Sequence, residues 1–235
     1  LQKLITSKSL EQNRVVITAT QMMQSMVESP IPTRAEVLDV ANSVFDGTDA
    51  VMLSAETAVG RHPDTVVEAM NRICIGAERH AQTRPDCEHL NVQFQRIDQA
   101  IAMAAMFMAT NVSVQAIVAL TESGSTAQWL SRIRSDVPIF ALSQLRDSRR
   151  RMALYRGVYP IAHEFPSADV EETLAGGVHL LFKQGFIKAG DRVILTMGEN
   201  TGCEGGTNSL RLVQIGEDGY VEQNPSLDIC PIDLG

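Results

Sequence analysis

The stretch VVITATQMMQSMVESPIPTRAEVLDVANSVFDGTDAVMLS, residues 15–54, decides the fold. Four of its first five side chains are β-branched, which predicts a buried strand over residues 15–19. Thr33 and Glu36 then form the pattern of a capping box, in which each side chain satisfies a backbone N–H at the start of a helix. A second apolar strand is predicted over residues 49–54. Strand, helix and strand in this order predict parallel pairing with a right-handed crossover.

Helices are predicted on both sides of this unit. The chain opens without Met on a helix-periodic segment, residues 1–13, and an uncapped helix at the first residue leads us to expect the C-terminal part of something longer. The helix that starts at Thr33 is expected to end at Gly47, and a further helix follows Pro63. The side chains expected to face inward are Val37, Leu38, Val40, Ala41, Val44 and Phe45 in the helix after Thr33, and Val66, Val67, Met70, Ile73 and Cys74 in the helix after Pro63.

A second unit begins after the polar, nearly aperiodic segment 81–95, where we place a domain boundary. This divides the chain into 1–85, 86–215 and a surface tail, 216–235. Strands and helices alternate again in the second unit: helix 97–110, strand 115–121, helix 124–134, strand 138–143, a short arginine-rich helix, strand 158–162, helix 168–184, strand 192–198 and strand 209–215. The chain is therefore expected to be α/β, with an open, mostly parallel sheet in its second unit and helices on both faces.

The composition is that of a globular α/β protein. The 235 residues carry a formal charge of -8, which argues against sequence-independent nucleic-acid binding because such binding needs a basic face. The four scattered cysteines include no CxxC pair, which argues against a zinc set and favours reduced thiols in a cytoplasmic protein. No apolar run approaches the ~20 residues of a membrane span.

Polar side chains stand at the carboxyl ends of the two predicted strands of the first unit. Thr20 follows strand 15–19, and Ser54 and Glu56 lie at the end of strand 49–54. In α/β barrels the active site forms at that end of the strands, where side chains from neighbouring strands converge. A threonine hydroxyl there can bond a substrate carboxylate or pass a proton through water. On spacing alone, however, a turn-capping Thr20, a packed Ser54 and a solvated Glu56 account for the pattern better.

The segment TESGST, residues 121–126, places four hydroxyls and a glycine between a strand and a helix. Free N–H groups and the positive helix end there favour a bound anion, and a phosphate monoester fits this arrangement. A cap cluster that binds nothing is the alternative. The loop GENTGCEGG, residues 198–206, follows another strand and is expected to close over the same ligand.

Two sets of charged residues suggest contacts between subunits or with anions. Arg34 and Asp39 lie about 140° apart on one helix, so they are expected to meet across a two-fold axis rather than within the helix. Two ordinary exposed charges are the alternative. The basic concentration is expected to be a solvated face for the most part, and consists of Arg132, Arg134, Arg146, Arg149, Arg150 and Arg151.

With these residues in view, the chain resembles pyruvate kinase of the bacterial type. Residues 15–63 are similar to the block that runs through the seventh and eighth strands of the family's catalytic barrel. The segments ALTESGSTA, ALYRGVYPI, GDRVILTMG and GGTNSLRLV resemble the family's C-terminal domain in order and spacing. The resemblance covers residues 1–215 and implies the last part of a (β/α)8 barrel followed by an α/β/α effector domain.

The resemblance implies phosphoryl transfer from phosphoenolpyruvate to ADP, which gives pyruvate and ATP in glycolysis, with Mg²⁺ or Mn²⁺ and K⁺. It implies that Thr20 contacts the substrate carboxylate and helps to protonate the enolate, and that Ser54 and Glu56 form the floor of the site. It also implies a homotetramer in which the helix carrying Arg34 and Asp39 lies at an interface.

The family's metal ligands, its phosphoryl-stabilising lysine and its K⁺ and nucleotide residues lie on earlier barrel strands, which this sequence does not contain. We therefore expect the 235-residue chain on its own to be catalytically incomplete and to hold no metal. A stand-alone regulatory protein that kept only the effector domain is the alternative. Retention of Thr20, Ser54 and Glu56 favours the enzyme.

The resemblance also implies a phosphorylated effector on the second unit. Thr173 stands where bisphosphate-regulated members carry a basic residue, with Glu171 and Glu172 beside it, so we expect a sugar monophosphate or AMP rather than fructose 1,6-bisphosphate. The residues expected to bind the phosphate are Thr121, Ser123, Gly124, Ser125, Thr126, Asn200, Thr201, Gly202 and Gly205.

Overall fold

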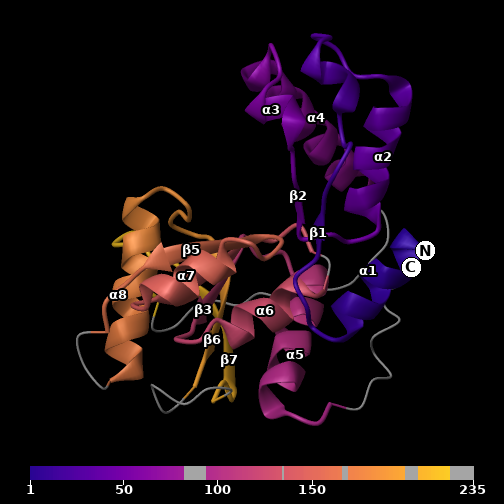
Figure 1. The fold of residues 1–235 in the computed structure, drawn as a ribbon. Coiled ribbons are helices and arrows are strands. Elements are labelled where there is room, and N and C mark those ends of the chain that lie inside the picture. The colour runs from indigo at the N-terminus through magenta and orange to yellow at the C-terminus, as the bar shows by residue number, and fades with distance from the viewer. Residues whose placement is uncertain (82–93, 134, 166–168, 199–205, 223–235) are drawn as a thin grey trace, which may run out of the picture.

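A computed structural model describes residues 1–81, 94–133, 135–165, 169–198 and 206–222. The first part of the chain holds a two-stranded parallel sheet with helices, and the second part holds a five-stranded sheet. The two parts touch where the amino ends of the two short strands reach the helices of the second part (Figure 1). Among the described residues, none of the helices combines the length and the apolar character that a membrane span requires.

The first part follows the predicted alternation, with shorter strands than expected. Its elements are α1 (Gln2–Glu11), β1 (Ile17–Thr18), η1 (Gln24–Val27), α2 (Arg34–Phe45), β2 (Ala50–Val51), α3 (Ala55–Ala58) and α4 (Pro63–Ala81). β1 and β2 pair in parallel, as predicted, with Ile17 opposite Ala50 and Thr18 opposite Val51. The strands predicted over 15–19 and 49–54 shrink to two residues each because ladder pairing between the described residues extends no further.

Local sequence signals fix both ends of α2. The Thr33 hydroxyl accepts a hydrogen bond from the N–H of Glu36, and the Glu36 carboxylate accepts one from the N–H of Thr33 at 2.8 Å, so the predicted capping box is confirmed. Beyond the helix, Gly47 has a φ of 91° and its N–H donates to the Val44 carbonyl at 3.1 Å. A left-handed glycine just after the last helical residue is the usual helix stop.

The core of the first part is narrower than the apolar stripes predict. Val67, expected to face inward, is 52% exposed, and Leu38 is 61% exposed. Leu4 and Ile5 of α1 are exposed as well, and only Thr6 of that helix is buried. The buried residues come from the loop after β1, from α2 and from α4: Met22, Met23, Met26, Val40, Val66, Ala69 and Met70. Four of these seven residues are methionines, whose flexible, unbranched side chains fill irregular core space well.

The second part matches the predicted elements closely. Its strands run in the order β5-β4-β3-β6-β7, all parallel except β7, which is antiparallel to β6. The elements are α5 (Ile97–Asn111), β3 (Ala116–Leu120), α6 (Ser125–Ser131), β4 (Ile139–Ser143), α7 (Arg146–Met152), β5 (Val158–Ala162), α8 (Val170–Lys183), β6 (Arg192–Met197) and β7 (Ser209–Gln214). The expected open, mostly parallel sheet is confirmed.

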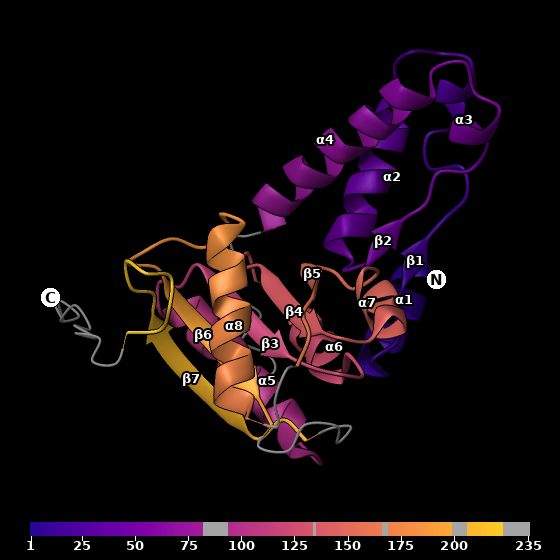
Figure 2. The same cartoon turned by 90° about the vertical axis from the view of Figure 1, so that its left-hand side faces the viewer.

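Helices cover both faces of this sheet (Figure 2). One face packs against α5, α6 and α7, and the other packs against α8. Gly177 lets α8 approach the sheet, since a Cβ there would lie 2.2 Å from the Leu142 Cδ1 atom. Both faces of β3 and β4 are fully buried, so these strands read as continuous apolar runs.

The chain turns back on itself after β7. Ile215 and Val221 form an isolated antiparallel bridge, and the Gly219 residue between them has a φ of 77°. The Tyr220 ring stacks on the His179 ring of α8, with 4.3 Å between ring centroids. This turn therefore packs against the helix that covers one face of the sheet.

Candidate active site and phosphate loop

Thr20 lies two residues beyond β1, at the carboxyl end of the strand, as its place in the sequence predicts. Its φ is 72° and that of Gln21 is 53°, both in the left-handed region, and both residues are exposed. Non-glycine residues reach this region at a cost of about 1–3 kcal/mol each, and such strain is concentrated at functional sites. The backbone turn presents Thr20 to solvent beside the buried methionines that follow it.

Ser54 and Glu56 follow β2 at the same end of the sheet, but their side chains have different surroundings. Ser54 is exposed, whereas Glu56, in α3, is only 1% exposed. One Glu56 oxygen accepts the N–H of Met23 at 3.2 Å and the other accepts the N–H of Ser54 at 2.7 Å. The expectation of a solvated Glu56 is wrong. Its carboxylate joins the loop after β1 to the loop after β2.

The hydrogen bonds to Glu56 favour its ionised form. Burial works to raise the pKa of this carboxyl, but the backbone N–H groups of Glu56, Ser54 and Met23 outweigh burial, and the pKa lies below the ordinary value of 4.5. Glu56 is therefore a buried carboxylate that is held by its neighbours, and no proton is available on it near neutral pH.

A second carboxylate, Glu36, fixes the same loop from the other side. Besides the capping box, Glu36 accepts the Ser25 N–H at 2.7 Å and the Ser25 hydroxyl at 2.6 Å. Burial acts to raise the pKa of Glu36, but the bonds from Ser25 and Thr33 bring it below 4.5. The sequence pattern marks Glu36 as a cap but gives no sign of its bonds to Ser25, which lies eleven residues earlier.

The 121–126 loop lies between β3 and α6, and its hydroxyls bond mostly within the loop. The Thr121 hydroxyl accepts the Gly124 N–H at 3.0 Å, and the Ser123 hydroxyl accepts the Ser125 N–H at 3.3 Å. Thr121 and Thr126 are buried, while Ser123 and Ser125 are partly exposed. Ser123 and Ser125 are therefore the hydroxyls of this loop that solvent reaches.

Gly124 and Thr126 anchor this loop to the domain. Gly124 has a φ of 85°, and a Cβ there would lie 2.8 Å from the Met152 Cγ atom, so only glycine fits. The Thr126 hydroxyl lies 2.6 Å from the hydroxyl of Thr207, which precedes β7. The loop is thus tied to the segment that enters the last strand.

The structure describes some of the other predicted residues and leaves others outside the described ranges. Asn200, Thr201, Gly202 and Gly205 lie outside the described residues, as does Arg134. Thr173 is fully buried and its hydroxyl donates to the Asp169 carbonyl at 3.0 Å, while Glu171 forms an ion pair with Arg211 of β7. Arg34 and Asp39 are both exposed on α2.

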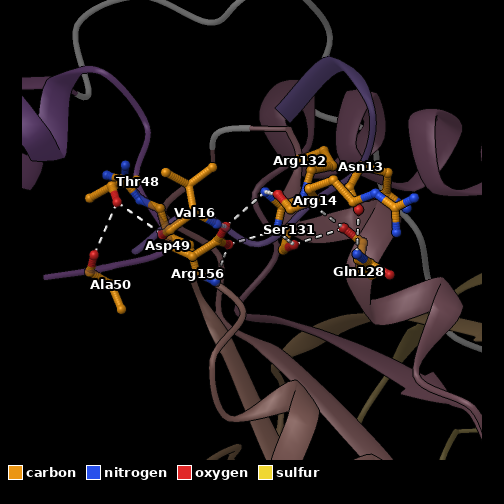
Figure 3. A network of polar contacts seen from close by, with 10 residues as sticks. All are labelled: Asn13, Arg14, Val16, Thr48, Asp49, Ala50, Gln128, Ser131, Arg132 and Arg156. Carbon is orange, nitrogen blue, oxygen red and sulfur yellow. Dashed lines mark hydrogen bonds and ion pairs between the residues drawn. The ribbon is translucent and has the colours of Figure 1, made fainter. Parts of the chain in front are cut away.

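Arg132 does not lie on a solvated face. Its guanidinium binds both oxygens of Asp49, at 2.6 and 3.0 Å, and the two side chains are 9% and 1% exposed (Figure 3). The expectation of a mostly solvated arginine cluster is wrong for this residue. The cause lies in the fold, because α6 ends against the start of β2 and brings the guanidinium into direct contact with the carboxylate.

The described residues do not fit a metal site. None of their His, Cys, Asp and Glu side chains gather in groups of three or more that would hold an ion. The carboxylates of Glu36, Glu56 and Asp49 are each occupied by N–H donors of the chain itself.

Comparison with known proteins agrees with this architecture. The model of the pyruvate kinase barrel domain matches residues 1–67, and that of the pyruvate kinase alpha/beta domain matches residues 99–213. Pyruvate kinase II of Salmonella typhimurium is 47% identical over 216 residues, which are 92% of this chain and 45% of the relative. Pyruvate kinase of Haemophilus influenzae is 46% identical over 84% of the chain and 41% of the relative, and that of Geobacillus stearothermophilus is 40% identical over 90% and 36%.

The chain thus spans less than half the length of these relatives. Its two-stranded sheet falls in the region matched to the barrel domain, and its five-stranded sheet falls in the region matched to the alpha/beta domain. The chain belongs to the pyruvate kinase family, in which it represents the end of the barrel domain together with the alpha/beta domain.

Proposed function

We propose that this chain serves as the closing part of an enzyme that transfers the phosphoryl group of phosphoenolpyruvate to ADP, giving pyruvate and ATP. The observation that carries the proposal is the tie between two loops at the carboxyl ends of adjacent parallel strands, where Glu56 bonds the N–H groups of Met23 and Ser54. This tie holds Thr20 and Ser54 on the same side of the sheet, in a chain that matches both domains of the family.

Within this proposal the three polar residues have separate roles. Thr20, exposed on a strained turn, contacts the substrate carboxylate and helps to deliver a proton to the enolate carbon. Ser54, also exposed, lies on the neighbouring loop and contributes to the floor of the site. Glu56 acts as a positioning residue, because both of its oxygens are used to hold backbone N–H groups.

The proposed reaction uses Mg²⁺ or Mn²⁺ and K⁺, for which the described residues offer no ligand set. Those ions would neutralise the charge of the transferring phosphoryl group. We place their ligands in the part of the relatives that this chain does not match, and we expect the 235-residue chain alone to be inactive.

Complementation tests this function directly. The chain is mixed with the segment of Salmonella pyruvate kinase II that precedes the matched region, and pyruvate formation from phosphoenolpyruvate and ADP is followed in a coupled assay. We expect activity in the mixture and none in either piece. Thr20→Val should lower kcat without weakening assembly of the two pieces. A stable complex of the wild-type pieces without turnover would refute the proposed activity.

We further propose that the 121–126 loop binds the phosphate of a sugar monophosphate or AMP. The partly exposed hydroxyls of Ser123 and Ser125 support this, and the buried Thr173 beside the paired Glu171 leaves no basic side chain in the first turn of α8 for a second phosphate. Calorimetric titration with glucose 6-phosphate, ribose 5-phosphate, AMP and fructose 1,6-bisphosphate tests the order. Tight binding of the bisphosphate alone would contradict it.

A stand-alone regulatory protein is a second candidate, favoured by the complete core on both faces of the five-stranded sheet. A chain that binds one of these phosphates but never complements the Salmonella segment would support it over the enzyme.

We also propose that the whole protein is a cytoplasmic homotetramer in which Arg34 of one subunit meets Asp39 of another. Both residues are exposed on α2. In the complemented protein, Arg34→Asp should weaken the tetramer in light scattering, and the reciprocal pair Arg34→Asp with Asp39→Arg should restore it. Equal tetramer content in the wild type and the single variant would exclude this contact.

A further inference from the structure

Asp49 is a buried acceptor for four hydrogen bonds from three separate segments. One oxygen accepts the Val16 N–H at 2.9 Å and an Arg132 Nη at 3.0 Å. The other accepts the second Arg132 Nη at 2.6 Å and the Arg156 N–H at 3.1 Å. The Asp49 side chain is 1% exposed, so these four bonds replace its hydration.

On one side, Asp49 fixes the amino ends of both short strands. It immediately precedes β2, and its own N–H donates to the Val16 carbonyl at 2.9 Å, just before β1. The Thr18 hydroxyl donates to that of Thr48 at 3.1 Å and strengthens the same junction. Each strand has only two residues, so a shift at this end is carried directly to the loops with Thr20 and Ser54.

On the other side, Asp49 is held by the α/β domain. Arg132 directly follows α6, the helix whose first residue, Ser125, belongs to the 121–126 loop. The Gln128 side chain of α6 also donates to the Asn13 carbonyl at 2.6 Å (Figure 3). Seven helical residues span about 10 Å, so the loop and the ion pair lie at the two ends of one short rigid element.

We propose that Asp49 is a positioning residue through which α6 links the 121–126 loop to the loops after β1 and β2. The physical path is contiguous: loop, α6, Arg132, Asp49, the two strands, and the backbone N–H groups of Met23 and Ser54 that Glu56 holds. The link between domains stands on the described contacts alone. Its use by a phosphate rests on the effector binding proposed above.

Amide hydrogen exchange of the 235-residue chain tests the link without any ligand. Arg132→Gln and Asp49→Asn should each speed exchange of the Met23 and Ser54 amides about tenfold or more, because each leaves a buried polar group unsatisfied. Arg132→Lys keeps the positive charge but loses the bidentate guanidinium geometry, so it should increase the exchange rates less. The matched control is Arg150→Gln, which breaks only the exposed pair with Asp147 and should change the rates less than about twofold.

The amides of β6 are the internal reference, because β6 is an interior strand that pairs with β3 on one side and β7 on the other. Their rates should stay unchanged in all variants. Unchanged Met23 and Ser54 rates in Arg132→Gln, or equal acceleration in β6, would overturn the proposal.

A second arm adds glucose 6-phosphate at saturation. The wild type should show slower exchange at Met23 and Ser54, and Arg132→Gln should bind the sugar phosphate but lose this slowing. If glucose 6-phosphate binds the wild type and the slowing is absent, the coupling to the loop is wrong. If it does not bind at all, the effector proposal fails, and the ligand-free arm still decides the link between the domains.

Discussion

Thr126 and Thr207 share a hydrogen bond of 2.6 Å between two buried hydroxyls, one at the start of α6 and the other just before β7. Neither hydroxyl is reached by water, so each depends on the other. The bond connects the 121–126 loop to the last strand of the sheet.

This dependence predicts strong non-additivity. Thr126→Val or Thr207→Val alone should destabilise the chain by about 1–3 kcal/mol, since each leaves a buried hydroxyl unpaired. The double variant should cost less than the sum of the two, because both partners are then apolar and of similar shape. Urea unfolding of the wild type, the two single variants and the double variant gives the free energies of this double-mutant cycle. Strictly additive costs would mean that the two hydroxyls do not interact.

Glu56→Gln should loosen the tie between the two loops. A glutamine presents one oxygen and one NH₂ to the two N–H donors of Met23 and Ser54, so one donor loses its acceptor. The expected loss is about 1–3 kcal/mol in the free energy of unfolding. Glu28→Gln is the control: Glu28 forms only an exposed pair with Arg61 and should cost less than about 0.5 kcal/mol. Equal effects of the two variants would contradict the positioning role.

The lowered pKa values of Glu36 and Glu56 predict acid sensitivity of the first part of the chain. A carboxyl whose pKa is lower when folded than the unfolded value of 4.5 stabilises the fold above that value, and this contribution is lost as the pH falls through the folded pKa. Stability should therefore fall with pH below about 4.5, and Glu36→Gln should flatten that part of the curve. Urea midpoints measured across this range check it, and identical pH curves for variant and wild type would exclude Glu36 as a source.

Gly124→Ala should cost more than Gly185→Ala, although both glycines have a left-handed backbone. It forces alanine into a φ of 85° and places a Cβ 2.8 Å from a buried Met152 side chain, whereas Gly185 has a φ of 76° and open space. Left-handed strain costs about 1–2 kcal/mol at either position, and overpacking adds about 1–3 kcal/mol at Gly124 but not at Gly185. Thermal unfolding of Gly124→Ala and Gly185→Ala separates the two effects, and equal shifts would show that Met152 moves freely.

The sequence allowed much of the α/β domain to be predicted, because its signals are local. β5 has the predicted bounds at both ends, since Gly157 turns the chain immediately before it. The predicted strands of the first part were too long. None of residues 15–19 is buried and Ile17 is 47% exposed, so the β-branched run there indicates neither burial nor a long ladder, which needs a neighbouring strand at each position.

The surroundings of Arg132 and Glu56 were predicted wrongly for the same physical reason. Arg132 finds its partner 83 residues away in the sequence, and the donors to the Glu56 carboxylate are the backbone N–H groups of Met23 and Ser54. Nothing in residue spacing marks such contacts, because they are created by the approach of two loops or two domains. Thr20 was placed correctly at a strand end, but its left-handed backbone has no signature in a non-glycine residue.

Because of the left-handed backbone at Thr20 and Gln21, thermal stability and catalytic turnover favour different side chains at these two positions. Glycine reaches their φ values of 72° and 53° without strain, so a library selected only for heat resistance would enrich glycine at both positions. A library selected for turnover in the complemented enzyme would keep the threonine hydroxyl instead. Sequencing the two pools would thus separate the residues that hold this fold from those that serve its substrate.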